Sequence, residues 1–354
     1  MMKDKPEMLD RACEALRTCL ADIPSIQVDQ IQVEPAGYPA RPDLLARLSL
    51  PDGQVVIVAE VECNGQPRVA RQAVQQISSM TRLFPRSYGV FIAPYISPAA
   101  ARICAQWDIG YIDLAGNCRL SFWPVYVRQE GNPNPFPAKR DLRSLYSPKA
   151  ERILRVLLVN PKRTWKTQEL ADEAGVSIGQ VANVKRLLDD REWIRTDRSG
   201  FGMADSEALM REWGQEYGFR RNTTFDFYML GAISQMETRL AEVCTQQGIR
   251  YALTGFSGGA RYAPAVRYER VTAYVESGAI ERVAAALELK KVTSGANLSL
   301  MVPYDEGVLY GSQDVGGQCV ASPVQVYLDL TSLRGRGEEA AQAVLSGVIR
   351  PSWR

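Results

Sequence analysis

The chain has 354 residues, 46% of them hydrophobic and 23% charged, which is typical of folded globular domains and allows two or three of them. The formal net charge is only +2, so contact with nucleic acid requires a local patch of basic residues. No hydrophobic run is long enough to cross a bilayer, and residues 1–6 do not resemble a signal peptide. We therefore expect no membrane partner.

Histidine is absent, which excludes Ser-His-Asp and Cys-His catalysis and metal sites that depend on imidazole. The seven cysteines are scattered, without a Cys-x-x-Cys pair, and their number is odd. This pattern argues against a zinc site and favours reduced, mostly buried thiols in the cytoplasm. Any chemistry would depend on carboxylates, lysine, arginine, tyrosine or cysteine.

Residues 1–128 predict a first domain of mixed helices and strands. Helical periodicity predicts a helix over 8–20, and three strands follow at 26–34, 43–50 and 54–63. A helix over 69–84, a strand over 88–93, a helix over 98–107 and a strand over 111–114 complete the domain. The initial α-β-β-β-α-β order resembles the PD-(D/E)XK nuclease fold.

Acidic residues at two strand ends extend this resemblance. Asp43 opens the second strand, and Glu60 and Glu62 end the third. In such nucleases an Asp and a Glu at these points hold a divalent cation such as Mg²⁺, and a Lys two residues after the Glu stabilises the phosphate. Here Glu62 occupies the Lys position, where a third carboxylate repels the phosphodiester. Arg68 or Arg71, on the following helix, could supply the missing cation.

The resemblance also includes the segments Ala93–Ser97 and Tyr111–Asn117. Because of Glu62, we expect a degenerate nuclease fold that serves as a binding or dimerisation module and requires no cofactor. Asp43 and Glu60 would hold Mg²⁺ only if the domain were active. In the simplest alternative, Asp43 is an ordinary residue at the start of a strand, and Glu60 and Glu62 share one solvated face of a strand.

A linker is predicted at residues 129–146, because Gly131, Pro133, Pro135 and Pro137 alternate with other residues in a stiff, extended segment.

Residues 147–215 predict a winged helix-turn-helix. Ser147-Pro148 begins a helix through 159, Thr167 is the expected N-cap of a short helix, and Gly175 makes the turn. Ser177 caps a second helix over 178–190, and residues 193–196 and 201–203 form a hairpin wing.

The second helix has the side chains of a recognition helix. Val181, Val184 and Leu188 lie on one face and would pack on the core. The opposite face and the wing carry groups that suit base edges and phosphates. The predicted contacts with double-stranded DNA are Ser177, Gly179, Gln180, Asn183, Lys185, Arg186, Arg195 and Arg198. Alternatively, this unit binds another protein, and its polar helix face is merely solvated.

Residues 216–354 predict a third, α/β domain. A long helix is predicted over 225–247, then a strand over 250–254 that enters a Gly/Ser-rich turn at 255–259. Strands at 271–276 and 298–303 precede a helix that starts at Ser322 and another over 338–349. The glycine-rich turn resembles a nucleotidyltransferase site. That chemistry needs several carboxylates, however, and the strand that should supply them offers only Glu276, so we expect the fold without the activity.

With the winged helix before it, this domain resembles the AbiEi family of antitoxins and transcriptional regulators of type IV toxin–antitoxin systems. Ser322-Pro323 and Tyr327–Leu330 resemble the closing helix of that family. The resemblance covers roughly the last 200 residues. It implies operator binding, autoregulation, and opposition to a nucleotidyltransferase-like toxin without stable contact.

Two functions from different classes remain open. The first is a DNA-binding transcriptional regulator that acts as a homodimer. Its pairing surface would be the N-terminal sheet or the predicted helix over 225–247, with Phe225, Tyr228, Met229, Ile233 and Met236. The second is a metal-dependent DNA endonuclease targeted by the winged helix. Glu62 favours the regulator.

Overall fold

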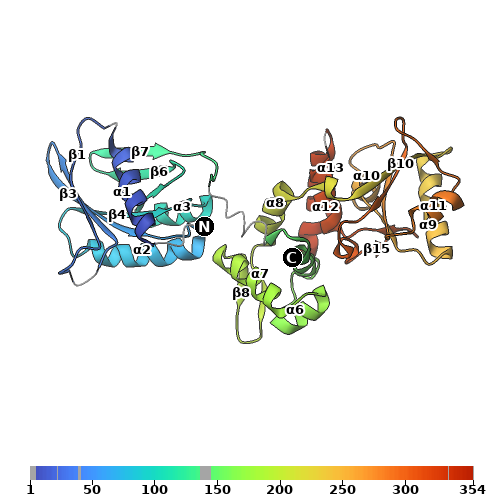
Figure 1. The fold of residues 1–354 in the computed structure, drawn as a ribbon, viewed down its shortest axis with the longest axis horizontal. Helices are drawn as coiled ribbons and strands as arrows, with labels where there is room; N and C mark the ends of the chain where they lie inside the picture. Colours follow the sequence, from blue (N-terminus) through green and yellow to red (C-terminus); the bar gives the residue numbers. More distant parts are fainter. Residues whose placement is uncertain (1–4, 22, 39–40, 136–144, 334, 354) are drawn as a thin grey trace. The chain divides into compact units, whose positions relative to one another are not determined.

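The structure is a computed structural model that describes residues 5–21, 23–38, 41–135, 145–333 and 335–353 (Figure 1). It divides into two compact units. The first unit comprises residues 1–143 and 187–192, and the second comprises residues 144–186 and 193–354. The predicted second and third domains therefore fall almost entirely into one unit. Residues 136–144 of the predicted linker lie outside the described residues.

The first unit is a seven-stranded mixed sheet covered by helices. Its elements are α1 (Lys5–Ala21), β1 (Gln27–Val33), β2 (Leu44–Leu50), β3 (Gly53–Val61), α2 (Pro67–Thr81), β4 (Ser87–Ala93), α3 (Pro98–Gln106), β5 (Gly110–Asp113), β6 (Cys118–Phe122) and β7 (Val125–Gln129). The strands lie side by side in chain order. β3, β4 and β5 are parallel, and the other neighbours are antiparallel.

The predicted order of elements through residue 114 is confirmed, and β6 and β7 are additional. The sequence analysis placed Gln129 in a linker, but it pairs with Cys118 as the last residue of β7. Hydrophobic and polar residues alternate only weakly along β7, an edge strand in which Val125 alone is buried. A half-solvated edge strand has no strong hydrophobic signal.

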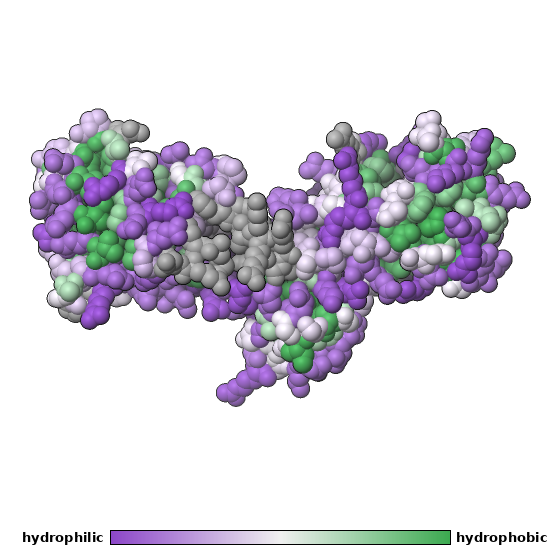
Figure 2. All heavy atoms as spheres, in the orientation of Figure 1, coloured by the Kyte–Doolittle hydropathy of each residue, from purple (hydrophilic) through white to green (hydrophobic). Residues whose placement is uncertain are grey.

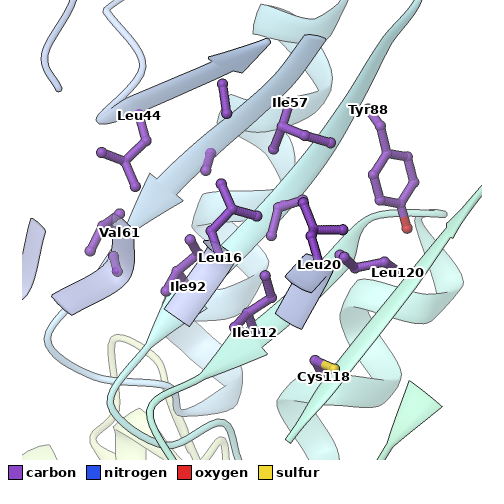
Figure 3. Close-up of a cluster of buried hydrophobic side chains, with 14 of the residues drawn as sticks. Leu16, Leu20, Leu44, Ile57, Val61, Tyr88, Ile92, Ile112, Cys118 and Leu120 are labelled. Carbon is purple, nitrogen blue, oxygen red and sulfur yellow. The ribbon is translucent and has the colours of Figure 1, made fainter. Parts of the chain in front are cut away.

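Each face of this sheet is covered by helices. Leu16 and Leu20 of α1 pack on one face, against Ile57 and Ile92 (Figure 3). On the other face, α2 and α3 contribute a second hydrophobic cluster that includes Ile77. Successive β3 residues alternate between the two clusters, as the period of a strand requires.

Asp113 connects the two segments that extended the nuclease resemblance. Its buried carboxylate accepts hydrogen bonds from the amides of Ile96, at 3.2 Å, Ala115, at 3.0 Å, and Asn117, at 2.8 Å. These segments therefore lie together at the carboxyl ends of β4 and β5. In this structure the two segments have a structural role, since they supply the hydrogen bonds that a buried carboxylate needs.

The second unit begins with the predicted helix-turn-helix and hairpin: α5 (Pro148–Val159), α6 (Thr167–Ala174), α7 (Ile178–Asp190), β8 (Ile194–Thr196) and β9 (Phe201–Met203). Gly175 follows α6 with φ of 62°, the left-handed conformation that favours glycine at a helix end. The prediction that Thr167 is the N-cap of α6 is wrong, because Thr167 is the first helical residue. Lys166 is the N-cap, and the carboxylate of Glu169, three residues later, accepts a 3.3 Å hydrogen bond from its amide.

A second seven-stranded sheet follows, in the order β13-β10-β14-β12-β11-β16-β15. The elements are α8 (Ser206–Glu216), η1 (Phe219–Arg221), β10 (Thr223–Tyr228), α9 (Ile233–Gln246), β11 (Tyr251–Leu253), α10 (Gly255–Tyr262), β12 (Val271–Val275), α11 (Ile280–Ala286), β13 (Lys290–Lys291), β14 (Leu298–Val302), η2 (Glu306–Leu309), β15 (Gln313–Asp314), β16 (Cys319–Val320), α12 (Pro323–Thr331) and α13 (Gly337–Val344). A π-helical segment, Leu345–Ile349, and α14 (Arg350–Trp353) complete the unit.

The predicted helix over 225–247 is wrong in its first part. Residues 223–228 form β10, which pairs with β14, and the helix α9 begins only at Ile233. The aromatic and β-branched residues of β10 suit a strand, and Gly231, with φ of 135°, separates the two elements. Met229 and Met236 are buried in this unit, so they are not available as a pairing surface.

The predicted glycine-rich turn is also wrong, since residues 255–262 form helix α10. A Cβ at Gly258 would lie 2.9 Å from the carbonyl oxygen of Leu253 and 3.0 Å from Cγ2 of Val326 on α12. Glycine is therefore needed here for the close packing of α10 on β11 and α12. Close packing therefore accounts for a glycine at position 258, and no role in nucleotide binding is needed to explain it.

Candidate nucleic-acid interface

The helix α7 has a buried face and an outward face, as predicted. Val181, Val184 and Leu188 are each 0% exposed. At its start, Oγ of Ser177 accepts a hydrogen bond of 3.2 Å from the amide of Gln180, which confirms the predicted cap. A capped helix with one face in the core presents its other face in a fixed orientation.

The predicted DNA-contact residues lie on the outward face of α7 and on the hairpin. Ser177, Gly179, Arg186, Arg195 and Arg198 are exposed, and Gln180, Asn183 and Lys185 are half-buried. Arg186 donates a 3.4 Å hydrogen bond to Oδ1 of Asn183. Figure 2 shows hydrophilic side chains at the tip of the hairpin labelled β8 in Figure 1.

The hairpin is attached to the helices by backbone and aromatic contacts. The amide of Trp165 donates to the carbonyl of Phe201 at 2.8 Å, and the amide of Phe201 donates to the carbonyl of Trp165 at 3.0 Å. Nζ of Lys185 lies 4.8 Å from the centroid of the Phe201 ring, a cation–π contact. These contacts position the wing relative to α7.

A hollow of about 330 Å³ lies between the hairpin, α7 and the start of α6. Its lining includes the basic residues Lys166, just before α6, Lys185 of α7 and Arg198 of the hairpin turn, together with the acid Asp197. Sequence analysis missed Lys166, because it lies between two segments and belongs to no helix face. Three cations around a surface hollow suit a phosphate group of the DNA backbone.

A buried ionic network holds α5 against the rest of the second unit. Glu151 and Arg155 of α5 are both 0% exposed. Arg155 donates 2.9 Å hydrogen bonds to Oε1 of Gln325 and to the hydroxyl of Tyr304. Glu151 accepts a 2.7 Å hydrogen bond from Arg221 and another from Tyr304. Because buried charges need such partners, this network specifies how α5 packs on the C-terminal sheet.

Asp329 of α12 extends the network into the core of the sheet. The hydroxyls of Tyr217 and Tyr274 each donate to its carboxylate at 2.9 Å, Thr254 donates as well, and Nε2 of Gln325 donates at 2.9 Å. Burial raises the pKa of Asp329 to about 6, and these hydrogen bonds oppose the increase. Gln325 links Asp329 to Arg155, so one continuous network runs from α5 to the core.

Sequence analysis missed this network. The sequence predicts the helix that begins at Ser147-Pro148, but it gives no indication that polar residues of this helix are buried. Glu151 and Arg155 are four residues apart, a spacing that also occurs on exposed helix surfaces. Their partners are up to 170 residues away in the chain, so no local signal reveals the burial.

The acidic residues of the first unit lie close to one another. Asp43 is 6% exposed, and its Oδ2 accepts a 2.9 Å hydrogen bond from the amide of Val61. Nζ of Lys5, on α1, lies 2.6 Å from Oδ1 of Asp43. Burial, and next the charge of Asp43, raise the pKa of Glu60 to about 8, and the pKa of Glu62 is raised for the same reasons. The cation beside Asp43 is therefore Lys5, not Arg68 or Arg71.

A divalent cation would need the oxygens of Asp43 and Glu60. Both oxygens of Asp43 are engaged by Lys5 and Val61. Among the residues that the structure describes, no three or more His, Cys, Asp and Glu side chains are grouped so that they could hold a metal ion. The donor set as it lies here does not fit a divalent cation. No helix within the described ranges is both long and apolar enough to span a membrane.

Residues 203–350 match the AbiEi_2 family model, described as a transcriptional regulator, AbiEi antitoxin, of type IV toxin–antitoxin systems. The match begins at the last residue of β9 and ends at the first residue of α14. The resemblance of this part of the chain to the AbiEi family is thereby confirmed. No curated protein matches the sequence.

Three solved structures are similar to parts of this chain. A repair endonuclease from Pyrococcus abyssi is 15% identical, covering 32% of this chain and 48% of its own, with a TM-score of 0.25. EndoMS in a complex with double-stranded DNA is 16% identical, over 29% and 44%, with a TM-score of 0.22. SfsA from Pyrococcus furiosus with Ca²⁺ is 14% identical, over 36% and 64%, with a TM-score of 0.20. This chain spans less than two thirds of each.

Proposed function

We propose that this protein is a DNA-binding transcriptional regulator that binds duplex DNA through a winged helix formed by residues 148–203. The observation that carries the proposal is the outward face of α7, where Asn183 and Arg186 lie together above a fully buried opposite face. Asparagine pairs with adenine and arginine with guanine in the major groove. A helix of this kind can therefore distinguish base pairs.

The wing supplies the contacts that do not depend on sequence. Arg195 and Arg198 are exposed on the hairpin, and Lys166, Lys185 and Arg198 surround the hollow beside it. Basic groups that flank a recognition helix neutralise phosphates and set its register in the groove. This local concentration of positive charge compensates for the low net charge of the chain, +2.

The region that matches the antitoxin family supports the same function. Its helix α12 contacts α5 through Gln325 and Arg155, so the family-matching part of the chain packs directly on the first helix of the winged helix. We infer an autoregulatory, antitoxin-like protein that works in the cytoplasm as a homodimer. Its functional counterpart would be a nucleotidyltransferase-like toxin, opposed without stable contact.

A gel-shift measurement on the promoter region of the protein's own gene tests this proposal. Asn183→Ala and Arg186→Ala should each cost about 1–3 kcal/mol of specific binding if the two side chains contact bases. Arg239→Ala on α9 is a matched control, because it removes an exposed positive charge from the same unit. Unchanged affinity in both helix variants would remove α7 from the groove.

The alternative function, a metal-dependent endonuclease targeted by the winged helix, makes a different prediction. It requires cleavage of plasmid DNA with Mg²⁺ or Mn²⁺ that disappears in Asp43→Ala. We expect the N-terminal domain to be inert or very slow, since Glu62 stands where a lysine is needed.

A further inference from the structure

The most unusual side-chain cluster outside the proposed DNA interface is the acidic site of the first unit. Asp43 is 6% exposed, and two further carboxylates, Glu60 and Glu62, follow at the end of β3. Burying several carboxylates together is unfavourable unless a cation neutralises them. In this unit the cation comes from α1, where Lys5 reaches Asp43 at 2.6 Å.

The position of Lys5 differs from that of the lysine in the nuclease motif. Position 62, two residues after Glu60, holds a glutamate, so β3 itself supplies no positive charge to the cluster. Lys5 lies 38 positions before Asp43 in the chain and on a different element. Its ammonium group contacts Oδ1, while Oδ2 is held by the amide of Val61. Both oxygens of the buried carboxylate therefore have donors of their own.

We propose that Lys5 is the built-in cation of the acidic site and that its ammonium group excludes a divalent metal ion from Asp43 and Glu60. An ammonium group and a divalent cation compete for the same carboxylate oxygen, and the tethered group is always present. The exclusion arises from position and charge together: the ammonium repels an approaching cation and occupies one of the oxygens that would bind it. The nuclease-like fold thus keeps its acidic residues as a salt bridge instead of a metal site.

This proposal is tested by measuring how tightly Mn²⁺ binds to the full chain. The electron paramagnetic resonance signal of free Mn²⁺ and calorimetry both report this binding. Any affinity tag belongs at the C-terminus, away from Lys5. The variants are Lys5→Ala, Lys5→Ala with Asp43→Asn, and Arg17→Ala. Arg17 is a matched control because it is an exposed cation on the same helix. The side chain of Lys5 is 54% exposed, so its replacement does not open the hydrophobic core.

The wild-type protein and Arg17→Ala should show no Mn²⁺ binding that depends on Asp43. The affinity of Lys5→Ala for Mn²⁺ should be at least about tenfold higher than any affinity of the wild-type protein, because a neighbouring positive charge has been removed. Adding Asp43→Asn should abolish that gain. Circular dichroism checks folding, and Lys5→Met, which keeps the aliphatic chain, replaces Lys5→Ala if the alanine variant unfolds.

Two results would overturn the proposal. The first is wild-type protein that binds Mn²⁺ and loses this binding in Asp43→Asn, because the site would then accept a metal ion beside Lys5. The second is a folded Lys5→Ala or Lys5→Met variant whose affinity for Mn²⁺ does not increase, because Lys5 would then not be what keeps the ion out.

Discussion

Arg155 on α5 donates a 2.9 Å hydrogen bond to the side-chain oxygen of Gln325 on α12, a residue 170 positions later in the chain. The guanidinium also lies 5.1 Å from the ring of Trp213 on α8. One buried arginine thus connects the proposed DNA-binding helices with two helices of the part that matches the AbiEi family. Because of these contacts, the orientation of α5 depends on how α8 and α12 pack in the second unit.

Replacing Arg155 should destabilise the second unit strongly. Arg155→Met keeps most of the side-chain volume but removes the charge that faces Glu151, which is 0% exposed. Glu151 keeps its ion pair with Arg221, so the loss in the free energy of unfolding should lie below the value of about 3–5 kcal/mol that a buried charge left wholly without a partner costs. Urea denaturation followed by circular dichroism measures this loss.

Two further variants show whether the loss is electrostatic. Adding Glu151→Gln to Arg155→Met should restore part of the stability, since it removes the buried carboxylate that Arg155 no longer faces and leaves only Arg221, which is 32% exposed and can be solvated. Arg211→Met on α8 should have a much smaller effect, because its side chain is 57% exposed. Equal losses in Arg155→Met and Arg211→Met would contradict the role of the buried network.

Substitutions of the basic residues around the hollow should change DNA affinity in a different way from substitutions on α7. Lys166→Ala and Arg198→Ala each remove one cation next to the wing. Each variant should weaken binding to specific and nonspecific DNA alike, and it should reduce the dependence of log K on log salt by about one. Fluorescence anisotropy at several salt concentrations, with Arg239→Ala as control, measures both quantities. A change in sequence preference, with an unaltered salt slope, would instead place these side chains at base edges.

Stability of the second unit should depend on pH through Asp329. Burial raises the pKa of this carboxyl to about 6 in the folded state, above the value of about 3.9 for an exposed Asp. The folded protein therefore holds the proton more tightly than the unfolded chain does. The contribution of Asp329 to stability is then greatest below about pH 4 and is lost as the pH rises through about 6.

Asp329→Asn isolates this effect, because asparagine does not titrate. Relative to Asp329→Asn, the wild-type free energy of unfolding should fall by about 2 kcal/mol between pH 4 and pH 7. Urea denaturation of both proteins at these two pH values gives the difference directly. A difference that is independent of pH would show that Asp329 has the same pKa in the folded and unfolded states.

The regulator should act as a homodimer. A single winged helix makes few phosphate contacts, so its affinity at physiological salt is low, and two copies on an inverted repeat overcome this limit. Half-sites should lie about 34–36 Å apart, one turn of DNA, or a multiple of that distance. Light scattering after size exclusion tests the assembly. A mass of 39.3 kDa that does not change when promoter DNA is added would contradict this prediction.

The helix-turn-helix and the departure from the nuclease motif can both be recognised in the amino-acid sequence alone. Local interactions define α6 and α7: Gly175 in the left-handed conformation, the Ser177 cap, and the spacing of Val181, Val184 and Leu188. Such signals involve residues a few positions apart, so they can be recognised without knowledge of the fold. The same is true of Glu62, whose position is defined by its distance from Glu60.

Which polar residues are buried, and which cation lies beside Asp43, depends on long-range packing. Phe225–Tyr228 joins a sheet through β14, and a strand of this kind is stabilised by a partner more than 70 positions away. Arg155 and Lys5 likewise meet their partners through long-range packing. In the sequence Arg155 has the spacing of an exposed helix pair, and Lys5 lies before the first predicted helix. A charged side chain is buried only where the fold brings its hydrogen-bond partners to it, and local sequence does not contain that information.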